Sequence, residues 1–566
     1  MTGVQTCALP ISNRVAEIWT EHFIGVLNQV EPEVNPDIPA TPEVLGILDA
    51  PPTYAEICDV VYDLNTGKAP GIDQIPSEFL RCNVDTISNI LQVLFKKIWL
   101  EENVPEDWRR GLIIKLPKKG NLTDPNNWRG ITLLPVASKV FLKVIHQRIS
   151  QVFEEKSIIE DEQAGFRPGR SCTDQIFILR NIIEQSQEWQ LPLHINFIDF
   201  SKAFDSVHRD SLWKILEYYG IPPKLVRLIK MFYDDYRCAV RQPGVNPEWF
   251  EVQSGVRQGC VISPFLFIIA VDYLMKLSQR NYKLGLRWNL TTRLNYLAYA
   301  DDIALFATKH TGLQDFTNTL SAEANSIGLR INVNKTKIMR AGVHKQSIPN
   351  QQITIGGKQL EYVSEFPYLG AMVTESGGSD LDVDSRIRKA TMAYYRLSRI
   401  WYSKSLSHKL KIKIFKSNVL SVLLYGSETW KLTDDQLNKL KVFQTTYTRR
   451  IMNVKWFHRV TNKDLLKRSR QDDMGEIMER RRWKYVGHVL RRRGAPTEVS
   501  LGWAPEGKRR PGRPKQTWRR AMLKRLTTSG VKSWSEAAEL AKDRLKWQEM
   551  GKLMSSTQRV TRHSAN

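Results

Sequence analysis

Cysteine is scarce in this sequence, and long apolar runs are absent. The six cysteines, at positions 7, 58, 82, 172, 238 and 260, form no Cys-x-x-Cys pair. Their scatter argues against a disulfide framework and against a zinc knuckle or finger, so we expect reduced core residues. The longest apolar run, Pro264 to Val271, ends at Asp272 and is far too short to cross a bilayer. The start lacks the charged-then-apolar pattern of a secretory signal, so we do not expect secretion.

Acidic residues are also too few to balance the basic ones. The 566 residues include 59 Asp and Glu and 83 Lys and Arg, which gives a formal net charge of +24. Such a balance predicts a polyanionic partner, nucleic acid before membrane. The length allows two to four packed units, and 42% hydrophobic residues with 16 tryptophans indicate a globular chain rather than a disordered one.

The most informative stretch is residues 294–307, where two apolar runs flank Asp301 and Asp302. This pattern predicts a strand, a tight turn and a second strand. Adjacent carboxylates repel each other and lose solvation together, so a fold keeps them ionised mainly by supplying cations. Hard oxygen ligands on a rigid hairpin suit Mg²⁺. The alternative is an ordinary hairpin turn, in which Asp is common.

A third carboxylate strengthens the metal hypothesis. Residues 193–198 form a second short apolar run, which ends on Asp199 and is followed by an amphipathic helix with Asp210 at its start. If the two strands are neighbours in one sheet, Asp199 faces the Asp301-Asp302 turn. The site would then hold two metal ions about 4 Å apart, the arrangement that polymerases and nucleases use for phosphoryl displacement.

Several ordered motifs resemble those of reverse transcriptases. Residues 197–205, 254–264 and 299–302 are similar, in order, to three core motifs of these enzymes. Further similarity to the non-LTR (LINE-type) retrotransposon branch lies in residues 67–73, 128–134, 163–167, 366–370 and 424–430. The resemblance runs from about residue 55 to about 550. It implies an α+β right-hand polymerase with fingers, a ferredoxin-like palm, a helical thumb and a basic helical C-terminal region.

The resemblance also implies a division of the chain. Residues 1–11 look like translated sequencing-adaptor read-through and are set aside. Because resembling elements usually carry an endonuclease domain ahead of the polymerase, we expect an N-terminally truncated chain. The expected regions are an N-terminal extension and linker (12–53), fingers (54–190), palm (191–375), helical thumb (376–455) and a basic nucleic-acid-binding region (456–566).

The resemblance assigns the catalytic and metal-binding roles. Asp199, Asp301 and Asp302 are expected to bind two Mg²⁺ ions, with Mn²⁺ as a possible substitute. Lys335 is expected to lie near the leaving pyrophosphate as a general acid, although a surface lysine is the alternative. Phe204 lies five residues past Asp199, where a bulky ring would exclude a 2′-hydroxyl. The alternative role for Phe204 is core packing.

Further residues are expected to bind the nucleotide. Lys118 and Arg129, on a predicted fingers hairpin, suit a triphosphate, whereas the alternative is a solvated basic loop. Gln258 could donate a hydrogen bond beside the template–nucleotide pair. Gly259 would let the backbone approach that pair closely.

Basic residues at two places are expected to bind nucleic acid. In the fingers these are Arg167 and Arg170. The C-terminal candidates are basic residues interleaved with tryptophans, a pattern that suits backbone contact and base stacking: Arg509, Arg510, Arg513 and Lys515. A nuclear-import signal or a merely solvated tail are the alternatives for this cluster.

A second Tyr-Asp-Asp occurs at residues 233–235. It ends a helix-like periodic run, and Arg237 should break any apolar strand after it. We therefore interpret this motif as a solvated helix end.

The sequence thus predicts an RNA-directed DNA polymerase of non-LTR retrotransposition. Its partners would be an RNA template, a DNA primer or target DNA and dNTPs, in a nuclear and cytoplasmic ribonucleoprotein without a membrane partner. One alternative is a catalytically decayed or co-opted nucleic-acid-binding protein with the same fold. An RNA-templated RNA polymerase is disfavoured by Phe204, and a group-II-intron-like maturase would need a splicing domain that we do not find.

Overall fold

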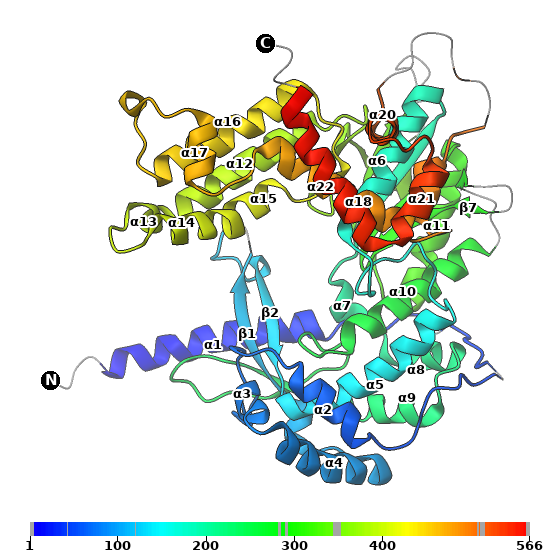
Figure 1. Ribbon diagram of the computed structural model, residues 1–566. Coiled ribbons are helices and arrows are strands. Elements are labelled where there is room, and N and C mark those ends of the chain that lie inside the picture. The colour runs from blue at the N-terminus through cyan, green and yellow to red at the C-terminus, as the bar shows by residue number, and fades with distance from the viewer. Residues whose placement is uncertain are drawn as a thin grey trace.

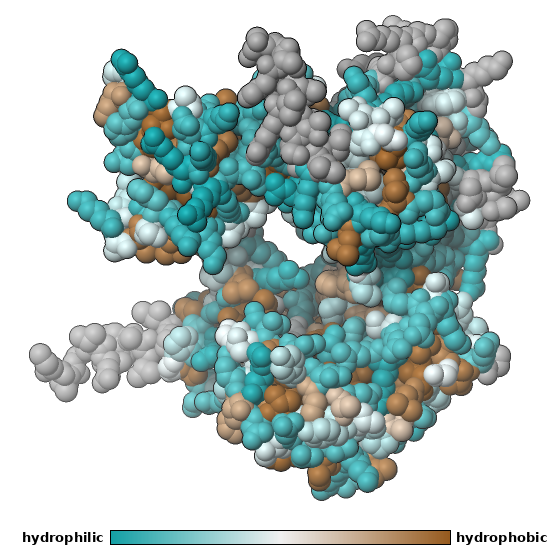
Figure 2. Space-filling model, viewed as in Figure 1, coloured by the Kyte–Doolittle hydropathy of each residue, from teal (hydrophilic) through white to brown (hydrophobic). Residues whose placement is uncertain are grey.

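A computed structural model describes residues 5–561 apart from 35, 42, 119, 281–284, 289–291, 343–351, 507–508 and 510–515, with side chains described between residues 13 and 552. Figure 1 shows two halves facing each other, with α1–α5 and α8–α10 in the lower half and α12–α22 in the upper half. An opening is visible between the halves in the space-filling view (Figure 2). Within the described residues, no helix has the length and apolar character that a membrane crossing requires.

The lower half begins with helices and a four-stranded sheet of order β2-β1-β4-β5, which we call the hairpin sheet. Its elements, in chain order, are α1 (Gln5–Leu27), α2 (Tyr54–Tyr62), α3 (Ser77–Arg81), α4 (Val84–Glu101), β1 (Arg110–Pro117), β2 (Trp128–Leu133), α5 (Val136–Glu155), β4 (Arg237–Val240) and β5 (Phe250–Glu251). The antiparallel β1–β2 pair matches the two strands expected in the fingers.

Strand β4 corrects one expectation about the second Tyr-Asp-Asp. A strand does continue after Arg237: residues 238–240 are buried and pair in parallel with β1. Asp234 and Asp235 are exposed on the turn between α9 (Pro223–Lys230) and β4. These two carboxylates therefore lie on a solvated turn, as expected, but ahead of a buried strand.

The second sheet, which we call the palm sheet, has the order β13-β10-β3-β9-β8. Its strands are β3 (Leu193–Ile198), β8 (Tyr296–Tyr299), β9 (Asp302–Ala307), β10 (Lys337–Ala341) and β13 (Glu361–Tyr362). Helices α6 (Cys172–Trp189) and α11 (His310–Ser326) pack on it. Helix α10 (Ser263–Gln279) packs against α11, and α8 (Arg209–Tyr218) packs against α10. Every residue of β3 is buried, which explains why its sequence is continuously apolar.

Side-chain alternation assigns the two faces of the palm sheet. Ile195 and Phe197 belong to the apolar cluster that contains residues of α6, whereas Ile198 packs in the cluster with α10 and α11. The helix after β3 differs slightly from expectation, because α8 is capped by the His208 side chain, and Asp210 lies in the first turn. Around the sheet lie short strand pairs: β6 (Leu286–Arg287), β7 (Arg293–Leu294), β11 (Thr354–Ile355), β12 (Lys358–Gln359), β14 (Glu365–Tyr368) and β15 (Ala371–Thr374).

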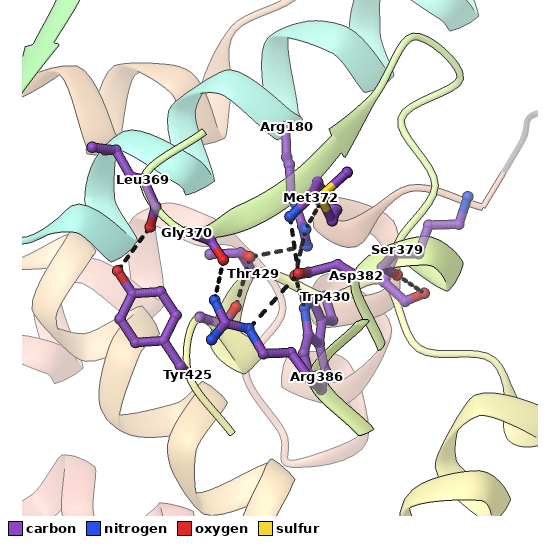
Figure 3. A network of polar contacts seen from close by, with 12 residues as sticks. Arg180, Leu369, Gly370, Met372, Ser379, Asp382, Arg386, Tyr425, Thr429 and Trp430 are labelled. Carbon is purple, nitrogen blue, oxygen red and sulfur yellow. Dashed lines mark hydrogen bonds and ion pairs between the residues drawn. The ribbon is translucent and has the colours of Figure 1, made fainter. Parts of the chain in front are cut away.

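The upper half starts with helices that fall in the predicted thumb region, residues 376–455: α12 (Asp380–Arg396), α13 (Ser398–Tyr402), α14 (His408–Ile414), α15 (Ser421–Leu423) and α16 (Asp434–Ile451). Helix α17 (Asn462–Arg468) follows them, beyond the predicted end of the thumb. Asp382 of α12 anchors them to the rest of the chain (Figure 3). Its fully buried carboxylate accepts hydrogen bonds from Arg180 of α6 at 2.8 Å, the Met372 amide at 2.9 Å and the Trp430 indole at 2.7 Å. The residue 424–430 motif thus helps to join α12 to the β14–β15 hairpin.

The C-terminal region is docked on α6. Its helices are α18 (Met474–Leu490), α19 (Pro496–Gly502), α20 (Trp518–Thr528), α21 (Trp534–Lys542) and α22 (Arg544–Thr561). An apolar cluster joins Trp483, Trp518 and Trp547 to Phe177 of α6. Part of this basic region is therefore packed structure.

Candidate active site

Two carboxylates from adjacent strands line one cavity of about 520 Å³. Asp199 directly follows β3, and Asp301 lies in the two-residue turn between β8 and β9, where Tyr299 pairs with Asp302. The β3–β9 pairing places Ile198 opposite Ile303, which brings the end of β3 beside that turn. Asp199 and Asp301 both face the cavity, as the sequence predicted for neighbouring strands.

Asp302 is placed differently from the other two. It begins β9 and is not among the residues that line the cavity. In the part of the chain that the structure describes, no three His, Cys, Asp or Glu side chains form a cluster that could hold a metal ion. Two of the three expected metal-binding carboxylates, Asp199 and Asp301, therefore line the cavity, and Asp302 follows Asp301 in the chain without lining it.

Electrostatics still couple the three carboxylates. Burial raises the pKa of Asp199 and of Asp301, and Asp199 raises the pKa of Asp301 further by repulsion. Loss of hydration, followed by repulsion from Asp301 and Asp199, raises the pKa of Asp302 to about 6. One oxygen of Asp199, Oδ2, is buried without a hydrogen-bond partner in the structure. Clustered anionic oxygens with an unsatisfied acceptor fit a hard divalent cation.

A lysine already approaches this pair. Lys335 lies on a turn before β10, with its Nζ 3.6 Å from Asp199 Oδ2 and its side chain 68% exposed. Strand β10 begins only at Lys337, because the chain turns just before it: the Lys335 and Thr336 amides donate to the Asn332 carbonyl at 3.2 and 2.9 Å. The positive charge of Lys335 lowers the pKa of Asp199 and so partly offsets the effect of burial.

Phe204 and Gln258 line the cavity, and Gly259 is the next residue after Gln258. The Phe204 ring stacks on Phe267 of α10 at 4.3 Å and lines the cavity. Gln258 lines it too, but its amide donates to Asp205 at 2.6 Å. Gly259 has φ +109°, and an added Cβ would collide with the Thr132 carbonyl. Glycine therefore lets this loop pack against β2 of the hairpin sheet.

The predicted triphosphate ligands come from the β1–β2 hairpin. Lys118 and Arg129 both line the cavity. Burial raises the pKa of Asp301, and that of Asp205 to about 6, and the charge of Arg129 offsets part of both shifts. The sequence reasoning missed a further cation in the cavity, Lys202, whose Nζ donates to the Gly25 carbonyl at 3.0 Å.

Helix α1 was also missed as part of the site. His22, Phe23, Val26 and Leu27 line the cavity, although this segment was predicted to be an extension and linker. Trp19 holds the helix in place by packing on Trp128 of β2 at a ring-centre distance of 5.4 Å. The helical spacing of Val15, Ile18, Trp19 and Phe23 was the available signal.

A second missed residue supports the catalytic turn. Ala300 has φ 57°, a left-handed conformation that is unfavourable for a residue with a Cβ. Gln163 Oε1 accepts hydrogen bonds from the Ala300 amide at 2.9 Å and from the Gly165 amide at 2.8 Å. Gly165 packs so closely that an added Cβ would collide with the Ala300 backbone. The 163–165 segment thus fixes the turn that carries Asp301.

The predicted fingers arginines are engaged within the protein. Arg167 differs from the expectation of a free template contact, because its side chain is 3% exposed, pairs with Glu154 at 2.8 Å and donates to the Glu160 and Gln163 carbonyls. Arg170 pairs with Asp161 but lines a second cavity. In the C-terminal cluster, Arg509 contacts Glu188 at 3.2 Å, whereas Arg510, Arg513 and Lys515 lie outside the described residues.

Comparisons with known proteins show which families and relatives this chain resembles. Residues 116–373 match the family described as reverse transcriptase (RNA-dependent DNA polymerase), and residues 393–425 match a domain of unknown function. A probable RNA-directed DNA polymerase from transposon BS of Drosophila melanogaster is 25% identical over 457 residues, which cover 78% of this chain and 48% of that protein.

Two further similarities have different extents. The transposon TX1 uncharacterized 149 kDa protein of Xenopus laevis is 29% identical over 296 residues, 52% of this chain and 22% of that protein. The chain therefore spans about half or less of the length of these two relatives. A solved structure of apo telomerase from Candida tropicalis aligns at 13% identity and a TM-score of 0.35 over 53% of this chain and 66% of that chain.

Proposed function

We propose that this chain is a reverse transcriptase of the non-LTR retrotransposon type, an RNA-directed DNA polymerase that extends a DNA primer with dNTPs. One observation carries the proposal. Asp199 and Asp301, contributed by adjacent strands of the palm sheet, share a single cavity with the cations Lys118 and Arg129 and with the Phe204 ring. Carboxylates opposite cations are what a metal–triphosphate substrate requires.

We further propose that Asp199, Asp301 and Asp302 hold two Mg²⁺ ions, with Mn²⁺ as a substitute. The raised pKa of each carboxylate supports this, because bound cations would stabilise the ionised forms. When bound, such ions activate a primer hydroxyl and neutralise the triphosphate.

The remaining residues would position and select the nucleotide. Lys118 and Arg129 would bind the phosphates from the β1–β2 hairpin, and Phe204 would exclude a 2′-hydroxyl by contact with its ring edge. Lys335 is exposed and 3.6 Å from Asp199, so it can move toward a leaving pyrophosphate and donate a proton there. Gly259 would keep the loop between β5 and α10 close to β2, and Gln258 would exchange its contact with Asp205 for one to the substrate pair.

In its element, the chain would copy the element's own RNA at a nicked genomic site within a nuclear and cytoplasmic ribonucleoprotein. Its RNA template, DNA primer and dNTPs follow from this proposal. The formal net charge of +24 supports a nucleic-acid partner.

The test is primer extension by the purified full chain on an RNA template with a DNA primer. We expect dNTP incorporation with Mg²⁺ or Mn²⁺, none with EDTA, and little incorporation of ribonucleotides. Tight binding of primer–template without incorporation under any metal would instead identify the decayed nucleic-acid-binding protein.

A further inference from the structure

A second cavity, of about 780 Å³, lies where the loop before α6 meets the C-terminal helices. Its cationic side chains come from segments more than 300 residues apart. Arg167 and Arg170 belong to the loop before α6, Arg491, Arg492 and Arg493 follow α18, and Lys542 and Arg544 lie where α21 gives way to α22. We call this cavity the basic cleft. It shares no lining residue with the cavity of Asp199 and Asp301.

The cations of the basic cleft outnumber its carboxylates. Glu154 and Asp161 line it, and they pair with Arg167 and Arg170. Outside the lining, Glu539 pairs with both Arg493 and Lys542. Arg491, Arg492 and Arg544 form no ion pair within the described part of the chain, so an excess of positive charge remains.

Backbone carbonyls hold two of these guanidinium groups in place. Arg491 Nη1 donates to the Ala541 carbonyl at 3.1 Å, and Arg492 Nη1 donates to the Gly169 carbonyl at 2.7 Å. These bonds orient the side chains without neutralising them. Each guanidinium has further donors that can bind an oxyanion.

The crowding has an electrostatic cost that an anion would relieve. Burial and the neighbouring Arg544 lower the pKa of Arg491. Burial, and after it the charge of Arg170, lower the pKa of Arg492. The carboxylates of Asp174 and Asp161 raise this pKa and so offset part of the shift. In addition, the Nε of Arg170 is buried without a hydrogen-bond partner in the structure.

We propose that the basic cleft binds the phosphodiester backbone of a nucleic-acid strand at a site separate from the polymerase cavity. Guanidinium groups match phosphate oxygens in geometry as well as in charge. The apolar lining consists of Leu490 and Ala495, without an aromatic ring for base stacking. Binding is therefore independent of base sequence and strongly dependent on salt.

The position of the cleft connects it to the catalytic turn. Arg167 and Arg170 lie in the same loop as Gln163, which holds the Ala300 amide. A strand bound in the cleft thus contacts the loop that fixes the Asp301 turn. This suits a strand that extends beyond the active site rather than the short duplex within it.

The test uses the full chain with Arg491→Ala and Arg544→Ala combined. The matched control is Arg480→Ala with Lys484→Ala, which removes the same charge from α18 but outside the cleft lining. Binding of a labelled 40-nucleotide RNA, and of DNA with the same sequence, is measured by fluorescence anisotropy between 50 and 300 mM KCl. Thermal unfolding checks that both variants are folded.

Losing two phosphate contacts should reduce the slope of log K against log salt by about 1.4 and weaken binding at 100 mM KCl on the order of tenfold. The control variant should show nearly the same slope of log K against log salt as the wild type, with only the small change that follows from its lower net charge. Equal losses in RNA and DNA would indicate shared backbone recognition, and a loss with RNA alone would restrict the site to RNA. An unchanged slope in the cleft variant overturns the proposal, and because no catalysis is involved, that result is independent of polymerase activity. Should the double variant not fold, Arg544→Gln, at an exposed position, should still reduce the slope by about half as much.

Discussion

Asp382→Ala should detach the thumb helices from the palm, because Asp382 is the acceptor that joins them. Its carboxylate is fully buried and binds Arg180, whose side chain is only 7% exposed. The Trp430 indole and the Met372 amide depend on the same carboxylate. Removing it leaves the Met372 amide and the Trp430 indole without an acceptor (Figure 3). It also leaves the buried Arg180 guanidinium without its carboxylate partner, with hydrogen bonds only to Thr429 and the Met372 carbonyl.

Breaking a buried, hydrogen-bonded ion pair from one side costs about 3–5 kcal/mol. For a unit of 150–250 residues, that loss lowers the unfolding midpoint by on the order of 10 °C. Differential scanning fluorimetry measures this shift, and limited proteolysis shows whether α12–α17 are released first. Primer extension should become less processive, because the β14–β15 hairpin loses a contact to α12.

Asp384→Ala is the matched control on the same helix. Asp384 is exposed and pairs with Lys439 at 2.8 Å on the surface, so its loss should cost less than about 1 kcal/mol. Equal midpoints for the Asp382→Ala and Asp384→Ala variants would refute the reasoning about the buried network.

Three further results are expected. Phe204→Ala should raise kcat/KM for ribonucleotides on the order of tenfold while Phe204→Tyr does not, and unchanged selectivity in steady-state assays would return Phe204 to simple core packing. Gln163→Ala should lower kcat about 10- to 100-fold with little change in the KM for dNTPs, because the Asp301 turn relaxes, and Gln163→Glu, which keeps the acceptor oxygen, should recover part of the loss. Burial raises the pKa of Glu184 to about 7 from an ordinary 4.5, so its stabilising effect is present at low pH and is lost as pH rises to about 7. The free energy of unfolding of the Glu184→Gln variant, measured in urea, should therefore rise by about 2–3 kcal/mol relative to that of the wild type between pH 5 and pH 8. If the two proteins show parallel dependences of unfolding free energy on pH, this prediction is wrong.

The sequence predicted the elements that depend on local pattern. The β8–β9 hairpin and strand β3 follow from apolar runs that end at carboxylates, and the placement of Asp199 beside Asp301 follows from the strands being neighbours. The α12–α16 helices likewise follow from helical periodicity.

Contacts between segments that are distant in the sequence could not be predicted from local sequence patterns. Nothing near Arg167 indicates that Glu154 and two carbonyls would bury it, and a basic motif alone cannot distinguish such an arginine from one that faces a template. The docking of α1 against β2 and of the C-terminal helices on α6 are tertiary events of the same kind. Strand β4 shows the reverse case, in which pairing with β1 overrides an unfavourable arginine at its start.

The most direct test of the account compares two Tyr-Asp-Asp motifs in one chain. Asp301 lines the cavity with Asp199, whereas Asp234 is exposed on the turn before β4. In single-turnover primer extension with Mg²⁺, Asp301→Asn should lower the rate by on the order of 10²–10³-fold or more, while Asp234→Asn leaves it unchanged. Wild-type rates in the Asp301→Asn variant would contradict the claim that this turn carries the chemistry.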